Sequence, residues 1–150
     1  MKIEGAYTFE APRERVWKVL LDPDTLQRCM PGCEKLEAIG PDQYEATLKI
    51  GVAAVKGTYM GKVAIADKEP PARYRLLVEG SGAPGWVKGE AVMELADQGD
   101  KTLVTMTADA QVGGLIAGVG QRLIGGVAKM MAGDFFKRLA EAAKSVGGAA

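Results

Sequence analysis

The two cysteines of this chain are the residues whose type and spacing could do redox or metal chemistry. Cys29 and Cys33 stand four positions apart, with Met30, Pro31 and Gly32 between them. Redox-active pairs use the tighter C-x-x-C spacing, and a structural zinc site needs four Cys, His or carboxylate ligands. The chain offers two cysteines and no histidine. We therefore predict no metal site here, and a helix-to-strand corner that carries two small thiols.

The lack of histidine also limits catalysis. Neither cysteine nor any serine has the partner that most often activates such nucleophiles. The inward acids or bases that remain are Tyr7, Tyr44 and Tyr59, whose ordinary pKa near 10 suits them poorly to work at neutral pH. The glycine-rich segment 113–126 lacks the third glycine of a dinucleotide fingerprint, since Leu123 stands there, and it lacks the lysine of a phosphate loop. We predict no catalytic residues.

Composition and charge indicate an ordinary globular domain. The chain has 150 residues, of which 47% are apolar and 25% charged, and we expect a single domain over residues 1–150. Its 19 acidic and 19 basic residues balance, which argues against a nucleic-acid partner because such binding needs a basic excess. We find no signal-peptide pattern and no apolar run long enough to cross a membrane. We therefore expect a cytoplasmic protein with reduced cysteines.

Seven segments predict β-strands, because apolar and polar residues alternate along each of them. These segments are residues 2–10, 33–39, 43–50, 55–67, 72–80, 86–96 and 101–112. Each strand has one apolar face, which is typical of an antiparallel sheet that packs on one side only. Two short helices are expected after the first strand, one beginning near Pro12 and one opened by Asp22 and Pro23.

A long C-terminal helix is predicted from about Leu115 to Lys144, where it would cover the apolar face of the sheet. One apolar stripe recurs at helical spacing, formed by Ile124, Ala128, Met131, Phe135 and Leu139. Five glycines, at positions 118, 120, 125, 126 and 133, each cost roughly 0.5–1 kcal/mol relative to alanine inside a helix. Such a cost suggests close backbone approach, a kink, or a helix that moves.

A second apolar stripe on this helix has two explanations. Its members are Ile116, Val119, Leu123, Val127 and Met130. The stripe could be buried beneath the loop around Pro31 and Gly32, within the same domain. Alternatively, it could be an exposed patch that marks a membrane or partner contact, or the mouth of a ligand pocket.

Together these elements predict an α+β domain in which a curved seven-stranded antiparallel sheet wraps around one long helix. A hollow remains between sheet and helix unless large side chains fill it, and several inward positions are small. The candidate ligand-binding residues are Tyr59, Met93, Met106, Ile124, Met131 and Phe135. The candidate portal residues, for membrane or partner contact, are Leu123, Val127 and Met130. Core filling is the alternative role for each methionine.

Several segments resemble the carbon monoxide dehydrogenase G-subunit (CoxG-like) family, which lies within the START-like (Bet v 1-like, SRPBCC) superfamily of helix-grip domains. They are MPGCE at 30–34, the run from KGTYMG to EGSG at 56–82, VGGLIAGVGQRLIGG at 112–126 and FFKRLAE at 135–141. The resemblance covers almost the whole chain and implies a helix-grip fold. It also implies that Cys33 is a structural corner residue.

The resemblance implies a non-catalytic accessory protein that holds a lipophilic molecule, such as a quinone, without a covalently bound cofactor. Members of the family accompany molybdenum-containing CO dehydrogenase-type enzymes and are associated with attaching them to the membrane. The chain stops shortly after its predicted helix, at SVGGAA, so we expect a transient membrane contact made by the domain itself, peripheral on the inner face. Two alternatives stay open: a cyclase- or hydratase-like enzyme of the same superfamily, and an assembly factor with a filled core and no ligand.

Overall fold

The computed structural model describes residues 1–52 and 55–149. Its elements are β1 (Lys2–Phe9), α1 (Arg13–Leu21), α2 (Pro23–Cys29), β2 (Cys33–Gly40), β3 (Gln43–Ile50), β4 (Gly57–Glu69), β5 (Arg73–Gly82), β6 (Gly85–Asp97), β7 (Thr102–Gly113), the 3-10 helix η2 (Leu115–Val119) and α3 (Gln121–Ala149). The strands form a seven-stranded antiparallel sheet in the order β1-β7-β6-β5-β4-β3-β2. The expected α+β fold class is confirmed.

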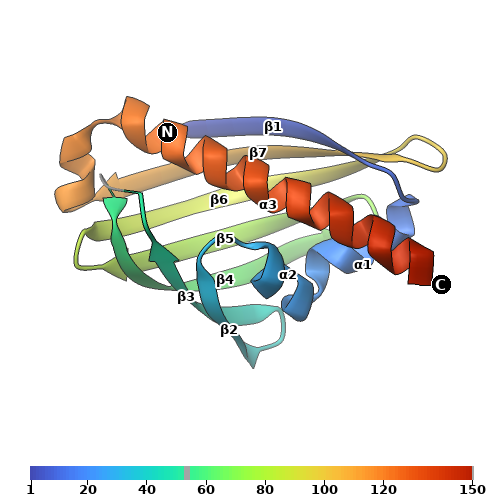
Figure 1. The fold of residues 1–150 in the computed structure, drawn as a ribbon, viewed down its shortest axis with the longest axis horizontal. Coiled ribbons are helices and arrows are strands. Elements are labelled where there is room, and N and C mark those ends of the chain that lie inside the picture. Colours follow the sequence, from blue (N-terminus) through green and yellow to red (C-terminus); the bar gives the residue numbers. More distant parts are fainter. Residues whose placement is uncertain (53–54, 150) are drawn as a thin grey trace.

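The long helix α3 crosses one face of the sheet (Figure 1). It begins beside η2 at one end of the strands and runs toward α1 and α2 at the other end (Figure 1). We call the face that it covers the inner face and the opposite side of the sheet the outer face. Apart from an irregularity between Ala66 and Glu69 of β4, the register is continuous from β3 to β7, so residues on neighbouring strands lie side by side in rows across the sheet.

The corner between α2 and β2 depends on a glycine. Gly32 adopts a φ of 78°, and a Cβ atom at this position would collide with the carbonyl oxygen of Lys49. The backbone N–H of Lys49 donates a hydrogen bond of 2.8 Å to the Gly32 carbonyl, which ties the corner to the end of β3. Only glycine combines this φ with so close an approach. The segment that separates Cys29 from Cys33 is therefore a turn, as predicted.

The main hydrophobic core lies at the α1 end of the molecule. Its fully buried side chains come from the sheet, from α1 and from the second half of α3, and include Phe9, Val16, Val104, Phe136 and Leu139. The rings of Tyr7 and Phe136 stack with their centroids 4.2 Å apart. A smaller cluster of Val55, Tyr59 and Ile116 lies at the η2 end. The interior thus has two packed regions, one at each end of the inner face.

The start of the C-terminal helix differs from the prediction. The α-helix begins at Gln121 and not near Leu115, because residues 115–119 form the 3-10 helix η2 and Gly120 has a φ of 94°. Gly118 and Gly120 therefore lie outside the α-helix, and only three of the five glycines carry the cost of a helical position. The helix also continues beyond Lys144, to Ala149.

Candidate functional site

An apolar cavity of about 220 Å³ lies between the inner face of the sheet and the first half of α3. Its sheet side is formed by β3, β4, β5 and β6, and its other side by η2 and α3. The lining includes Ala46, Leu48, Tyr59, Gly61, Gly80 and Val87 from the sheet, and Ile116, Ile124, Val127, Ala128 and Met131 from the helices. An aliphatic lining of this kind provides shape and hydrophobic contact for a guest.

The cavity exists because one row of the inner face carries two glycines and an alanine. Ala46, Gly61, Gly80 and Val87 pair with one another in sequence across β3, β4, β5 and β6. Two adjacent glycines leave the middle of this row without side chains directly below α3. Since protein interiors are otherwise close-packed, a row of this composition creates space that neighbouring side chains do not fill.

Val78 shows that the inner wall can be reached from outside. It lies on β5, the middle strand, and it lines the cavity on the same face as Tyr74, which is buried. Even so, 39% of the Val78 surface is exposed. A valine on the covered face of a central strand is normally buried, so its exposure indicates that the cavity opens to solvent.

Among the residues that the structure describes, one inward polar side chain lines the cavity, the phenol of Tyr59. The hydroxyl of Tyr59 donates a 2.6 Å hydrogen bond to the carbonyl oxygen of Val55, and burial raises the pKa of Tyr59 above its ordinary value. The phenol therefore stays protonated at neutral pH, with its proton engaged by the backbone. Lys62 and Glu79 border the cavity, but strand alternation puts their side chains on the outer face. This geometry can hold a hydrocarbon and offers no base to abstract a proton.

Three of the six predicted ligand-binding residues line this cavity, namely Tyr59, Ile124 and Met131. The other three lie elsewhere: Met93 and Met106 belong to the main core, and Phe135 packs against it. The alternation of apolar and polar residues correctly predicted that both methionines face inward. It does not indicate how far along the strand the cavity lies. That any of the six binds a ligand stays a prediction.

Sequence reasoning missed the sheet residues that shape the cavity, Ala46, Leu48, Gly80 and Val87. All four lie on the apolar side of their strands. Aligning the strands through their turns would have placed three of them in one row with Gly61. The sequence feature that could have located the cavity is therefore the clustering of small residues across neighbouring strands. Large residues within one strand do not indicate its position.

The second apolar stripe is not buried beneath the corner at Pro31 and Gly32, so that explanation is wrong. Leu123 and Met130 are 47% and 50% exposed, whereas Val127 is half-buried and lines the cavity. Ile116 belongs to η2 and is buried against Val55 and Tyr59. The stripe thus splits between the cavity wall and the surface beside it.

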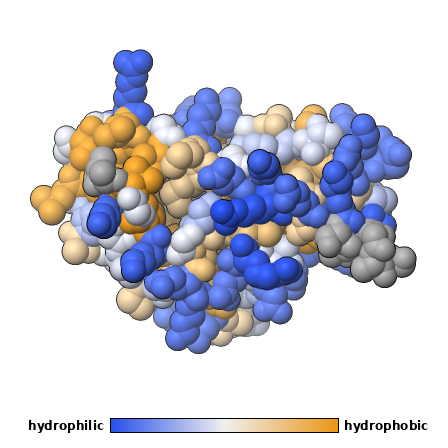
Figure 2. Space-filling model, viewed as in Figure 1, coloured by the Kyte–Doolittle hydropathy of each residue, from blue (hydrophilic) through white to orange (hydrophobic). Residues whose placement is uncertain are grey.

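An exposed apolar patch surrounds this end of the molecule. Leu115 in η2 is 79% exposed, and Val119, Leu123 and Met130 extend the patch along η2 and α3. Figure 2 shows apolar residues gathered at the end where η2 meets α3. Large exposed aliphatic side chains that cluster in one place usually mark a surface that contacts another molecule.

Basic residues dominate two of the segments that form this end. The segments 48–60 and 110–133 carry Lys49, Lys56, Arg122 and Lys129 and contain no acidic residue. All four basic side chains are exposed. The acidic Glu4 lies beside Gly125 and Lys129, accompanied by Lys2. Basic residues still outnumber acidic ones here, and this excess favours contact with anionic surfaces.

Neither cysteine is built for reactivity. Burial raises the pKa of the Cys29 thiol and of the Cys33 thiol above their ordinary values. In the part of the chain that the structure describes, no group of three or more His, Cys, Asp or Glu residues could hold a metal ion. The thiolate is the reactive form, so both side chains are predominantly unreactive thiols at neutral pH.

We expect iodoacetamide at pH 8 to alkylate both cysteines in the folded protein at least tenfold more slowly than it alkylates free cysteine. Mass spectrometry over time gives the two rates, and the half-buried Cys33 should react before the buried Cys29. The same reaction in denaturant is the control and should reach the free-cysteine rate. Fast alkylation of folded Cys33 would contradict the structural role of the corner.

Among the helices that the structure describes, none combines the length and the apolar character needed for a bilayer crossing.

The sequence profile of the carbon monoxide dehydrogenase G-subunit (CoxG) family matches residues 5–144. The chain belongs to this family. Membership of the CoxG family therefore rests on nearly the full length of the domain, including both walls of the cavity.

Solved structures place this CoxG family member among START-like folds. A conserved protein from Geobacillus kaustophilus is 43% identical, with a TM-score of 0.94 over 97% of this chain and 96% of that one. A START superfamily protein from Mycobacterium smegmatis is 13% identical, with a TM-score of 0.77 over 97% and 98% of the two chains. The Zhui aromatase/cyclase from Streptomyces sp. R1128 is 18% identical, with a TM-score of 0.70 over 96% and 93%. No curated protein matches the chain significantly.

Proposed function

We propose that this chain is a non-catalytic accessory protein that binds the hydrocarbon part of a lipophilic molecule, such as a quinone, between its sheet and α3. It would serve a carbon monoxide dehydrogenase-type molybdenum enzyme and meet the membrane through its η2 end. The observation that carries the proposal is the open aliphatic cavity bordered by the exposed Val78. The CoxG family takes its name from carbon monoxide dehydrogenase, which supports the choice of partner enzyme.

The size of the cavity limits what enters it. Apolar cavities of about 150 Å³ in proteins take a guest the size of benzene, and this one measures about 220 Å³. It therefore holds one ring, or a short stretch of a chain, and not a whole long-chain lipid. A longer tail would continue out of the opening and along the patch formed by Leu115, Leu123 and Met130.

The η2 end supports a membrane encounter for loading. Exposed aliphatic side chains can enter the apolar edge of a lipid leaflet, and each nearby Lys or Arg adds about 1 kcal/mol of attraction to an anionic surface. Lys49, Lys56, Arg122 and Lys129 supply such charges. A contact of this size is reversible, which suits a carrier that must leave the membrane again.

An enzymatic role in the cyclase or hydratase class has one observation in its favour, the fold shared with the Zhui aromatase/cyclase. At 18% identity that likeness concerns the fold alone. The inward phenol among the described lining residues, that of Tyr59, already donates to the Val55 carbonyl. We therefore favour binding over catalysis.

The proposal is tested by loading and extraction. The purified protein is incubated with vesicles of phosphatidylcholine and anionic phosphatidylglycerol that contain menaquinone, separated from them by gel filtration, and extracted with organic solvent for mass spectrometry. We expect close to one quinone per chain. A blank extract, together with no protection of the protein against thermal unfolding by the same vesicles, would overturn the proposal and leave a ligand-free assembly role.

A further inference from the structure

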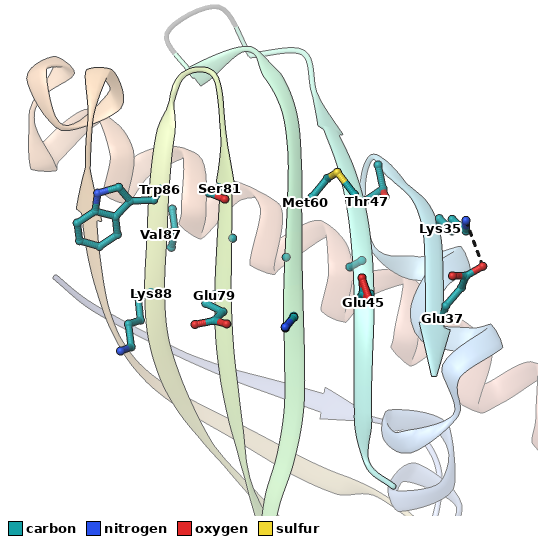
Figure 3. A pocket seen from close by; sticks show the side chains of 14 residues that line it. Lys35, Glu37, Glu45, Thr47, Met60, Glu79, Ser81, Trp86, Val87 and Lys88 are labelled. Carbon is teal, nitrogen blue, oxygen red and sulfur yellow. Dashed lines mark ion pairs between the residues drawn. The ribbon is translucent and has the colours of Figure 1, made fainter. Parts of the chain in front are cut away.

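The outer face of the sheet is unusual because it is hollowed and carries large exposed apolar side chains. Two shallow depressions of about 420 and 660 Å³ lie over β2 to β7. Met60 is 64% exposed and Trp86 is 44% exposed beside them. Figure 3 shows these side chains, with Glu45, Glu79 and Lys88, on the sheet surface turned away from α3. The cavity described above does not use this surface.

One row of this face alternates in charge. Glu45, Lys62, Glu79 and Lys88 lie side by side on β3, β4, β5 and β6, and all four side chains are exposed. None of them forms an ion pair within 4.0 Å with any other residue that the structure describes. The row therefore presents the pattern minus, plus, minus, plus to a partner.

This pattern is complementary to itself under one particular symmetry. We infer that the outer face binds the outer face of a second copy of this chain, about a two-fold axis that runs parallel to the strands between β4 and β5. Such an axis reverses the strand order, so Glu45 faces the other copy's Lys88 and Lys62 faces the other copy's Glu79. A two-fold interface brings the same patch of both copies together, so each of these contacts forms twice.

The neighbouring row fits the same axis by size. It consists of Thr47, Met60, Ser81 and Trp86, again in the order β3 to β6. Reversal sets each large side chain against a small one, Met60 against Ser81 and Trp86 against Thr47. Both large side chains are exposed in the single chain, and the pairing would bury them in the partner's depression.

The row on the other side of the charges follows the same rule. It consists of Gln43, Ala64, Leu77 and Glu90. Leu77, which is 37% exposed, then faces Ala64, and the amide of Gln43 can donate to the carboxylate of Glu90. Three consecutive rows are thus complementary in charge or in size about one axis.

A two-fold axis that runs across the strands along the charged row would also bring the outer faces together, but charge opposes it. It would set each member of the charged row against its own copy, Glu45 on Glu45 and Lys62 on Lys62. Like charges placed directly opposite are destabilising.

Charge pairing between neighbouring strands of one sheet is a rival explanation of the alternation, since Lys62 and Glu79 are also neighbours within one chain. A test must separate contacts within one chain from contacts between chains.

Reversing one charge on each of two separate chains distinguishes contacts within a chain from contacts between chains. Lys62→Glu alone places like charges face to face twice in a homodimer, and Glu79→Lys alone does the same. A mixture of the two variants pairs opposite charges at every position of the row. In sedimentation velocity at low salt, we expect each single variant to self-associate at least tenfold more weakly than the wild type. The equimolar mixture should recover wild-type affinity as a heterodimer.

The control reverses an exposed pair away from this face, Lys18→Glu on one chain and Glu14→Lys on another, both in α1. Neither control should change association. Circular dichroism checks that every variant is folded. The inference is overturned if the wild type stays monomeric up to about 1 mM at low salt. It is also overturned if the mixture of the two outer-face variants associates no better than either variant alone.

Discussion

Replacing Gly80 with valine is expected to weaken ligand binding strongly while the protein stays folded. Gly80 lies in the small row of the inner face, and a Cβ atom there meets its nearest neighbour, the Met60 carbonyl oxygen, at an ordinary 3.7 Å. The valine methyl groups would then occupy the cavity of about 220 Å³. We expect decylubiquinone to bind at least tenfold more weakly in equilibrium dialysis, a loss of more than about 1.4 kcal/mol.

The matched control is Ser81→Val, because Ser81 is the next residue on β5 and its side chain lies on the outer face. This variant should bind decylubiquinone as the wild type does. Valine favours strands and glycine weakens them, so Gly80→Val should unfold at the same temperature as the wild type or higher. Undiminished binding by a folded Gly80→Val protein would show that the guest does not occupy this cavity.

Replacing Phe136 with alanine is expected to cost about 3–5 kcal/mol of the free energy of unfolding. The side chain of Phe136 is 2% exposed and stacks on Tyr7 from the opposite layer, with an angle of 11° between the rings. Its removal leaves a void where α3 meets β1. At this chain length each kcal/mol lowers the melting temperature by roughly 2–4 °C, so calorimetry should show a clear shift.

The neighbouring Phe135 provides the comparison. It is half-buried and lies at the edge of the main core, so Phe135→Ala should cost less than half as much as Phe136→Ala. Decylubiquinone binding by Phe135→Ala also tests the prediction that Phe135 contacts the ligand. Equal losses of stability in the two variants would contradict the placement of the core at Phe136.

The strands and the direction of their side chains could be predicted because alternation is a local property of the chain. Tyr59, Tyr74 and Val104 point inward as expected. The break before α3 could not be predicted from periodicity, since apolar residues continue through η2 at nearly helical spacing. The φ of 94° at Gly120 ends that continuity, and a glycine can adopt this angle or an α-helical one with similar ease.

The cavity was only half predictable, because its position depends on which residues lie side by side across strands. Met93 and Met106 pair with each other in the main core, whereas Gly61 and Gly80 pair under the start of α3. Both pairs face inward. The residues that cover each pair decide whether the space above it is filled by side chains or left as a cavity. That choice is made by tertiary packing and not by local sequence pattern.

The separation of the main core from the cavity has a consequence for how this domain can change. Phe9, Val16, Phe136 and Leu139 hold the fold together at the α1 end, while Gly80, Val87 and Ile124 shape the space at the other end. Substitutions that change which ligand the cavity accepts therefore need not disturb the interactions that keep the chain folded. The domain can acquire a new specificity without an intermediate that fails to fold, and it offers a tolerant scaffold for engineered binding of small apolar molecules.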